Sequence, residues 1–352
     1  MRHSVISATG CYIPPWKVGN NSFLDHVFFD SSGKRLDLPT AKVIEKFHDI
    51  TNISERRYIS EGLRNSDIAF LAARQALKDL DEESLDYIIV AHNLGDAGEE
   101  GFCDTVPTIA ARVKHRLGIR NPYTVAFDLC FGCPGWLQGV ILADCIIKSG
   151  NAQRILVIGA ETPSRFLDPH DRDSMIYADG AGAALLEATE GEPGILSHAT
   201  RSDTLKEVRL LRLDKSCNPS LKGQRRFIRM DGHEIYKYAL RTVPEMVKRS
   251  LEKARVSLRE VSKILIHQAN EKMDRAMVKR LFKICGLPDV PEHIMPMTVS
   301  WLGNSWVATL PTLFHLLRRG VLENQSIRSG DIAVFASVGA GMNVNAMVYR
   351  VP

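Results

Sequence analysis

The sequence has no long hydrophobic run, no large excess of one charge and no dense set of cysteines. Its apolar stretches fall short of the roughly 18 residues that span a bilayer, which predicts a protein without a membrane segment. Lysine and arginine number 45 against 41 aspartate and glutamate, so the formal net charge is only +4. That balance argues against a nucleic-acid or anionic-membrane partner.

The seven cysteines are an odd number, scattered over 352 residues. They indicate a reducing compartment rather than a disulfide framework. The N-terminal sequence MRHSVISATGCYIPP has no apolar run long enough for a signal peptide. We therefore expect a soluble, cytoplasmic protein. With 45% apolar and 24% charged residues, the chain has an ordinary globular composition and enough length for one large domain or two.

Apolar runs typical of buried strands alternate with segments of helical period, which is the pattern of a layered α/β protein. Strands are expected at 85–91, 123–129, 154–159, 181–187, 263–267 and 331–335, and helices at 66–80, 134–148 and 240–254. Segment 18–57 is expected to be an irregular surface excursion rather than a catalytic segment. Segment 189–229, which is polar and basic, is expected to be a solvated loop.

The two halves of the chain resemble each other loosely. At 84–93 and again at 259–270, an acidic loop leads into a strand that ends in a His-x-Asn-like segment. A later strand in each half precedes glycine. Similarity this loose also arises by chance in α/β proteins. A true duplication predicts two similar halves that meet near residues 188–195, with the active site between them.

The strongest local signal is FDLCFGCPG at 127–135, where a buried strand turns sharply into a helix. Pro134 suits the first helical position, which places Cys133 at the N-cap. A sulfur there faces unpaired N–H groups and the positive end of the helix dipole, which favour thiolate over thiol. We expect Cys133 to be a nucleophile.

Cys130 and Cys133 form a C-x-x-C pair, which leaves three other interpretations open. No second C-x-x-C or close histidine pair completes a tetrahedral zinc site, so no metal is predicted. A thioredoxin-like dithiol also has its reactive sulfur at a helix start, but this chain is several times too long for that fold. A small buried cysteine is the plain alternative, and it suits Cys130 better than Cys133.

A nucleophilic cysteine needs a base or a hydrogen-bond donor from elsewhere in the chain. His267 ends a strongly apolar strand, and the carboxyl ends of strands are where the sites of open α/β sheets gather. Asn304 stands in a glycine turn, LGNS, between apolar segments. Taken singly, such a histidine is more often structural and such an asparagine is an ordinary turn residue.

Together, a cysteine at a helix start, HQAN after a strand and GNS before a helix resemble the β-ketoacyl-acyl-carrier-protein synthase III family of condensing enzymes. The resemblance spans nearly the whole chain, through 54–57, Cys133, 168–172, 177–183, 267–270, 303–305 and 339–341. It implies a thiolase-like α/β fold of two duplicated halves, 1–188 and 189–352, in five layers (α-β-α-β-α). It also implies a homodimer.

In this family a cysteine takes an acyl group from a thioester, and an enolate formed from a second, malonyl-type thioester attacks the bound carbonyl. The resemblance makes Cys133 the nucleophile, and it makes His267 and Asn304 the donors to the oxygen on which enolate charge develops. The backbone N–H groups of Cys133 and of a glycine-rich loop would form an oxyanion hole; that loop is Gly339, Ala340 and Gly341. No metal or redox cofactor is implied, because the substrates are acyl thioesters of acyl carrier protein or coenzyme A.

Departures from the family pattern bear on the substrate. Many members hold the adenine of coenzyme A between a Trp and an Arg, where this chain has Lys46 and Ile50, so an acyl carrier protein becomes the more plausible donor. A bulky phenylalanine closes the acyl pocket across the family dimer, and Val106 in its place implies a medium or long acyl chain. We expect a specialised branch, such as alkylresorcinol-type biosynthesis from malonyl or β-ketoacyl thioesters. Housekeeping initiation of fatty acid synthesis from acyl-coenzyme A is the alternative.

Two groups of charged residues complete these expectations. An altered loop carries three carboxylates that could supply an extra base, although solvation is the favoured interpretation: Glu99, Glu100 and Asp104. Family members dock the carrier protein on a basic residue after HQAN, and here four basic residues follow on a predicted helix: Lys272, Arg275, Lys279 and Arg280. A merely solvated basic face is the alternative. Competing functions are a same-fold acyltransferase to an oxygen or nitrogen acceptor and a non-catalytic dimer partner.

Overall fold

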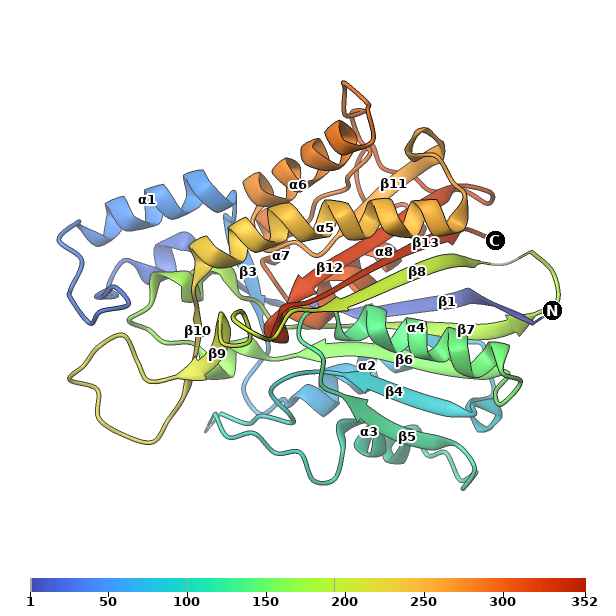
Figure 1. Cartoon of the computed structure of the whole chain (residues 1–352). Coiled ribbons are helices and arrows are strands. Elements are labelled where there is room, and N and C mark those ends of the chain that lie inside the picture. The colour runs from blue at the N-terminus through green and yellow to red at the C-terminus, as the bar shows by residue number, and fades with distance from the viewer. Residues whose placement is uncertain (1, 100, 193) are drawn as a thin grey trace.

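The computed structural model, which describes residues 2–99, 101–192 and 194–352, contains two large β-sheets with helices between and outside them (Figure 1). The first sheet has the order β1-β7-β6-β4-β5, with β1 (His3–Tyr12), β4 (Tyr87–Ala91), β5 (Val125–Leu129), β6 (Arg154–Glu161) and β7 (Gly180–Thr189). The second has the order β11-β12-β13-β8, with β8 (Ile195–Ser202), β11 (Val261–Ile266), β12 (Ile332–Gly339) and β13 (Asn343–Arg350).

The two sheets repeat one pattern of strand pairing. In the first, β1 with β7 and β7 with β6 are antiparallel, whereas β6 with β4 is parallel. In the second, β8 with β13 and β13 with β12 are antiparallel, whereas β12 with β11 is parallel. The first sheet adds β5, parallel to β4, at its edge. The loose sequence repeat therefore corresponds to a duplicated topology.

Helices fill the space between the sheets and cover both outer faces. α4 (Gly135–Lys148) and α8 (Thr309–Arg318) share one core with strands of both sheets, in which Trp136 and Phe314 both lie against Phe335. α2 (Asn65–Ala76) and α3 (Ile109–Leu117) cover the first sheet, and α5 (Gly232–Ala254) and α6 (Glu271–Ile284) cover the second. This is the five-layered thiolase-like fold that the resemblance implied, and the predicted division at residue 188 falls at the end of β7.

Two segments that were expected to be irregular contain regular elements. Segment 18–57 holds α1 (Thr40–Thr51) and most of a small sheet of β2 (Trp16–Gly19) and β3 (Glu55–Tyr58). Segment 189–229 holds β8, β9 (Leu211–Asp214) and the start of β10 (Phe227–Met230). Both expectations were wrong because these elements carry polar and charged residues that interrupt their apolar pattern. α1, for example, buries Val43, Ile44 and Phe47 on one side only.

The helices of the described residues include none that is both long and apolar enough to cross a membrane. The remaining short helix, α7 (Val299–Leu302), precedes the predicted Asn304 turn. The carboxyl ends of β5, β6, β11 and β12 meet near the boundary of the two halves, and there the predicted site residues come together.

Candidate active site

Cys133 lies in the sharp connection between β5 and α4, and its side chain is only 6% exposed. Gly132 before it has φ of 67°, and a Cβ there would stand 2.5 Å from the carbonyl oxygen of Ala340. A Cβ on Gly339 would stand 2.5 Å from the backbone nitrogen of Cys133. The loop after β12 therefore presses against the cysteine turn, and glycine at both positions permits this approach.

The start of α4 differs from the prediction by one residue. The helix begins at Gly135 with Pro134 as its N-cap, not at Pro134 with Cys133 as the cap. Burial raises the pKa of the Cys133 thiol to about 12, and the Glu161 carboxylate adds to the rise. Burial therefore opposes the stabilisation of the thiolate that the helix start was expected to give. With this pKa, the Cys133 side chain is a neutral thiol at neutral pH.

His267 directly follows β11 and is 4% exposed. Its backbone N–H donates to the carbonyl oxygen of Ala336 at 2.9 Å, which fixes the chain at the end of the sheet. Burial lowers the pKa of the imidazole to about 4, so the ring is neutral at neutral pH. Among the described residues, Nδ1 of this ring has no hydrogen-bond partner. His267 is thus a neutral, buried group with unused hydrogen-bonding capacity.

Asn304 is held so that its amide presents N–H groups rather than oxygen. Its Oδ1 accepts a hydrogen bond from the backbone N–H of Trp306 at 2.9 Å. Its own backbone pairs with the 176–178 segment on both sides, at 2.9 and 2.8 Å. Gly303 has φ of 71°, and a Cβ there would lie 2.8 Å from that of Arg56. With the oxygen occupied, Nδ2 is the free end of the side chain, and it can only donate.

These three residues line one cavity of about 480 Å³. Cys133, His267 and Asn304 are each at most 6% exposed and form its inner part, whereas Ile50 and Tyr236 are 53% and 39% exposed and mark its mouth. The wall between is mainly apolar and is formed by Phe47, Ile176, Leu211, Met230, Ile235, Met273, Val338 and Met342. The arrangement places a thiol, an imidazole and an amide N–H around a chamber with a mainly apolar wall that is open at one end.

Comparisons with known proteins match the two parts of the chain that contain Cys133 and, further on, His267 and Asn304. Residues 127–204 match the model of 3-oxoacyl-acyl-carrier-protein synthase III, and residues 251–351 match the model of its C-terminal domain. A β-ketoacyl-acyl-carrier-protein synthase III of Cereibacter sphaeroides is 34% identical over 309 residues, covering 85% of this chain and 88% of the relative. The chain belongs to the synthase III family.

Two further matches extend over the full length. The β-ketoacyl-acyl-carrier-protein synthase III of Ruegeria pomeroyi is 32% identical over 355 residues, covering 99% of this chain and 98% of the relative. The crystal structure of 3-oxoacyl-acyl-carrier-protein synthase III from Aquifex aeolicus VF5 has a TM-score of 0.80 and 29% identity, and each chain is covered to 99%. The family is one of thiolase-fold condensing enzymes, as the sequence motifs implied.

The mouth of this synthase III chamber is charged. Lys46 and Ile50, which the sequence comparison aligned with the adenine clamp of the family, both line it from α1. Arg172 and Asp173 also line it, with Arg172 Nε 3.8 Å from the Asp173 carboxylate. Burial and the neighbouring Asp171 raise the pKa of Asp173 to about 6. Sequence reasoning noted the segment containing Arg172 but assigned no role to Asp173.

A buried carboxylate behind the nucleophile was also missed. Glu161 ends β6, has no exposed surface and accepts hydrogen bonds from the backbone N–H and side-chain amide of Asn93, both at 2.8 Å. Burial raises its pKa to about 7. The available signal was a glutamate at the end of the apolar run RILVIGAE, on a strand whose carboxyl end points to the same edge as β5.

Neither Glu99 nor Asp104 lines the chamber of its own chain. Glu99 accepts a hydrogen bond from the backbone N–H of Gly62 at 2.9 Å, and Asp104 pairs with Arg112 at 2.8 Å. The hypothesis that either is an extra base is therefore wrong within one chain, and the position of Glu100 lies outside the described residues. Val106 is 82% exposed and does not line the chamber of its own chain.

The predicted docking residues lie on α6, whose first turn borders the chamber. Asn270 caps the helix by accepting from the backbone N–H of Met273, and both residues line the chamber. All four basic residues are exposed: Lys272, Arg275, Lys279 and Arg280. Arg275 pairs with Glu271 at 2.7 Å. A basic helical face therefore stands at the entrance.

Proposed function

We propose that this chain joins an acyl group, held as a thioester on Cys133, to a malonyl or β-ketoacyl thioester through a new carbon–carbon bond. The single observation that supports this most strongly is the meeting of the Cys133 thiol, the neutral His267 ring and the donor end of Asn304 in one buried chamber. A transferase that passes its acyl group to water, oxygen or nitrogen needs a nucleophile but has no enolate to stabilise.

In the first step the Cys133 sulfur attacks the carbonyl carbon of the donor thioester. The carbon–sulfur bond to the donor breaks, and the thiol proton leaves with the released thiol. Because the pKa of Cys133 is about 12, the thiolate is scarce at neutral pH. Proton loss must therefore accompany attack, and the neutral imidazole of His267 is a group in the chamber able to take that proton.

In the second step a malonyl thioester loses CO2, and the electron pair of the broken bond becomes an enolate. Asn304 Nδ2 and the His267 ring then donate hydrogen bonds to the enolate oxygen. Donors fixed in a dry site contribute roughly 3 kcal/mol each to such a charge, since they need no reorganisation. The enolate carbon attacks the acyl carbonyl, and the sulfur of Cys133 leaves and regains a proton.

A β-ketoacyl thioester as the second substrate keeps all its carbons, so a base must remove its α-proton. The neutral ring of His267 is available for that task, because burial keeps it unprotonated above about pH 4. A second oxyanion forms from the carbonyl oxygen of the acyl group on Cys133. The backbone N–H groups of Cys133 and Ala340 would donate hydrogen bonds to it. The close packing of the 339–341 loop against Cys133 supports this placement.

The chamber favours a medium or long acyl chain delivered by a carrier protein. Its volume of about 480 Å³ and apolar wall offer far more room than an acetyl group fills. Its mouth has Lys46 and Ile50 in place of the adenine clamp, and it adds the carboxylate of Asp173. The Asp173 carboxylate offsets the positive charges of Lys46 and Arg172 at the same mouth, and so weakens their attraction for the diphosphate of coenzyme A. These features support a specialised biosynthetic branch over the initiation of fatty acid synthesis.

Two surfaces support the proposed partners. The basic face of α6 at the chamber mouth suits an acidic acyl carrier protein. A second copy of the chain could pair with the edge strand β5, because the outer side of β5 has no neighbouring strand in the described chain. Phe102, Val106 and Tyr123, which are 72%, 82% and 84% exposed, lie in the segments before β5. A homodimer would cover these side chains and join the sheets.

Intact-mass spectrometry tests the proposal directly. Decanoyl carrier protein and decanoyl-coenzyme A are incubated separately with the wild type, Cys133→Ala and Cys130→Ala. We expect one decanoyl adduct that is lost only in Cys133→Ala, because Cys130 does not line the chamber. Absence of an adduct from both donors would refute the enzyme hypothesis.

A second arm tests the condensation. Malonyl or β-ketoacyl carrier protein is added to the acylated enzyme, and CO2 and the carbon–carbon product are measured. Asn304→Ala should still accept the decanoyl group but should condense about a hundredfold to a thousandfold more slowly. A product that is only an ester or amide would show the same-fold transferase instead.

A further inference from the structure

Residues 203–230, which we term the basic excursion, account for the whole net positive charge of this protein. The excursion has eight lysine and arginine residues against three acidic ones, a net charge of +5. The whole chain has a net charge of +4, so all remaining residues together carry −1. Of the eight, six are exposed: Lys206, Arg209, Lys215, Lys222, Arg225 and Arg226. These clustered basic residues create a local positive electrostatic potential that the small net charge of the whole chain does not indicate.

Exposed apolar side chains are interleaved with these charges. Leu205 is 92% exposed, and Val208, Leu213 and Leu221 are 48%, 37% and 47% exposed. Scattered apolar residues are normal on a surface, but four within one short excursion form a mixed basic and apolar face. Protein interfaces have this character, with apolar contacts surrounded by charges that set orientation and partner.

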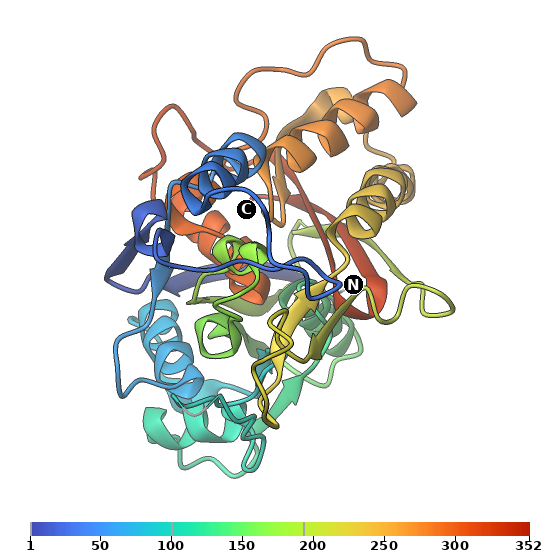
Figure 2. The ribbon, with the colours of Figure 1, turned by 90° about the vertical axis from the view of Figure 1, so that its left-hand side faces the viewer.

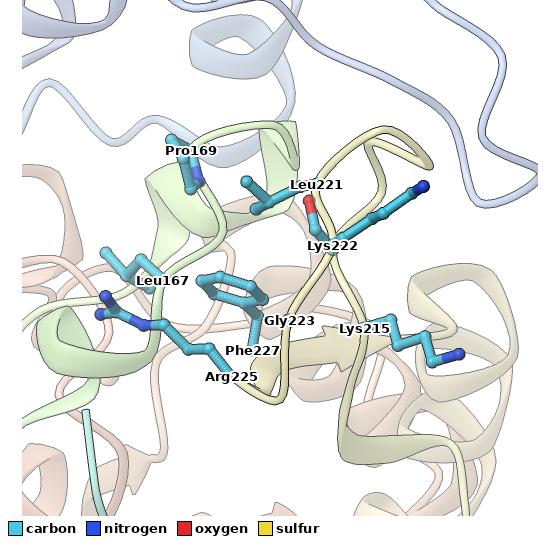
Figure 3. Close-up of a pocket in the computed structure, with 9 residues that line it drawn as sticks. Leu167, Pro169, Lys215, Leu221, Lys222, Gly223, Arg225 and Phe227 are labelled. Carbon is cyan, nitrogen blue, oxygen red and sulfur yellow. The ribbon is translucent and has the colours of Figure 1, made fainter. Parts of the chain in front are cut away.

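A cavity of about 510 Å³ opens at the base of this face. In Figure 3 the Phe227 ring lies at its centre beside Leu167 and Leu221, while Lys215 and Lys222 extend on one side and Arg225 on the other. The ammonium groups of Lys215 and Lys222 form no ion pair within the described residues. The cavity thus has an apolar floor and a rim of uncompensated positive charge.

The excursion is fastened to the body of the protein. The buried carboxylate of Asp168 accepts from the hydroxyl of Ser216 at 2.9 Å and from the backbone N–H of Cys217 at 2.6 Å. Arg225 donates to the carbonyl oxygen of Arg165 at 2.9 Å, and Arg229 pairs with Asp171 at 3.3 Å. A fixed surface loses little conformational freedom when a partner binds, so its charges can contribute to affinity.

The excursion and the chamber share one small sheet. Leu211 and Met230, which pair across β9 and β10, line the chamber. At the other end of the same ribbon, Phe227 lines the basic cavity, about 10 Å further along at 3.3 Å per residue. Figure 2 shows α1, α6 and the excursion on the same face of the molecule. A protein bound to the excursion would stand beside the chamber mouth.

We propose that the basic excursion is a docking surface for an acidic protein, and that this protein is the carrier that delivers the acyl thioester. This inference rests on the proposed function and adds a contact surface separate from α6. The favoured occupant is a protein rather than a small anion, because the charges and apolar residues spread along the whole excursion. A carrier with carboxylates among apolar side chains complements both features at once.

Charge reversal tests the docking. The variant Lys215→Glu/Lys222→Glu/Arg226→Glu leaves Arg225 and Arg229 to fasten the excursion. The control variant Lys78→Glu/Arg259→Glu/Arg319→Glu makes the same change in total charge at three exposed positions beyond the ends of α2, α5 and α8. Each protein is assayed for acylation of Cys133 by decanoyl carrier protein and by decanoyl-pantetheine, which has no protein to dock. Binding of labelled, unacylated carrier is measured by fluorescence anisotropy.

We expect kcat/KM with decanoyl carrier protein to fall by about tenfold to a hundredfold in the excursion variant, through slower association. The rate with decanoyl-pantetheine should stay within about twofold, which also shows that the variant is folded. The control variant should match the wild type with both donors. Raising the ionic strength from 0.05 to 0.5 M should weaken carrier binding more strongly in the wild type than in the excursion variant, which keeps only the basic face of α6.

Several results would overturn the inference. Equal loss with both donors would show that the excursion shapes the chamber instead of docking the carrier. Unchanged carrier binding and kcat/KM would show that the carrier touches only other surfaces, α6 among them. An equal loss in the control variant would assign the effect to net charge. Failure of the wild type to acylate Cys133 with either donor refutes the proposed function instead, and the anisotropy measurement still decides the docking.

Discussion

The contact between Gly339 and Cys133 gives a sharp test of how the chamber is assembled. Gly339 has φ of −171°, an extended conformation that alanine adopts freely, so Gly339→Ala adds a methyl group without backbone strain. That methyl would stand 2.5 Å from the Cys133 nitrogen and 2.7 Å from its Cβ, whereas comfortable contacts begin near 3.4 Å. One of the two loops must therefore retreat by roughly 0.9 Å, the difference between 3.4 and 2.5 Å.

A displacement of about 1 Å at reacting atoms costs on the order of a hundredfold in rate. Overpacking a close contact costs about 1 to 3 kcal/mol of stability. We therefore expect Gly339→Ala to fold, to melt several degrees lower and to acylate Cys133 about a hundredfold more slowly, as measured by intact mass and thermal unfolding. Gly19→Ala is the matched control, because no atom lies within 4 Å of its added methyl. Wild-type acylation and melting in Gly339→Ala would refute the packing argument.

Two further substitutions test the charges around the chamber. The pKa of Glu161 is about 7 in the folded protein, against an ordinary value of 4.5. The folded state therefore holds this proton more tightly than the unfolded state, and the wild type loses stability as the pH rises from 4.5 to 7. The loss is about 3 kcal/mol, at about 1.36 kcal/mol per pKa unit. Urea unfolding should show that the free energy of unfolding of Glu161→Gln, relative to that of the wild type, increases by this amount between about pH 4.5 and 8. A difference between the two proteins that does not change with pH would contradict this. Asp173→Asn should raise kcat/KM for acyl-coenzyme A severalfold relative to acyl carrier protein, while Glu45→Gln on α1, outside the chamber, should not. An equal change in kcat/KM for both donors would show that Asp173 does not select between them.

The buried framework of this protein is readable in the sequence because burial on both faces leaves continuous apolar runs. The predicted strand at 85–91 became β4 (Tyr87–Ala91), and the predicted helix at 134–148 became α4. β8 was missed because it lies at a sheet edge and carries His198, Arg201 and other polar residues. α1 was missed because turn residues frame it and only one of its sides is buried.

The site was predictable to a different depth at each residue. Cys133 has a local signal, since a strand, a cysteine and Pro-Gly in succession indicate a sharp turn into a helix. His267 and Asn304 have none that separates them from structural residues, and only the ordered set of family motifs brought them together. The thiol's raised pKa depends on burial by segments far away in the chain, which include the 339–341 loop, so no local pattern indicates it.

Uncharged polar groups lie at the inner end of the chamber and charged groups at its mouth, and this arrangement bears on how the chamber would work. The thiol and imidazole at the inner end are neutral at rest, and Asn304 adds an uncharged donor. The charged groups Lys46, Arg172 and Asp173 stand among the lining residues of the mouth, and the basic surfaces lie outside it. A negative charge that forms on a substrate oxygen inside would therefore meet fixed N–H dipoles in a low-dielectric space, where they act most strongly. Recognition of the carrier is left to charges that water can screen, which permits release once the acyl group has been transferred.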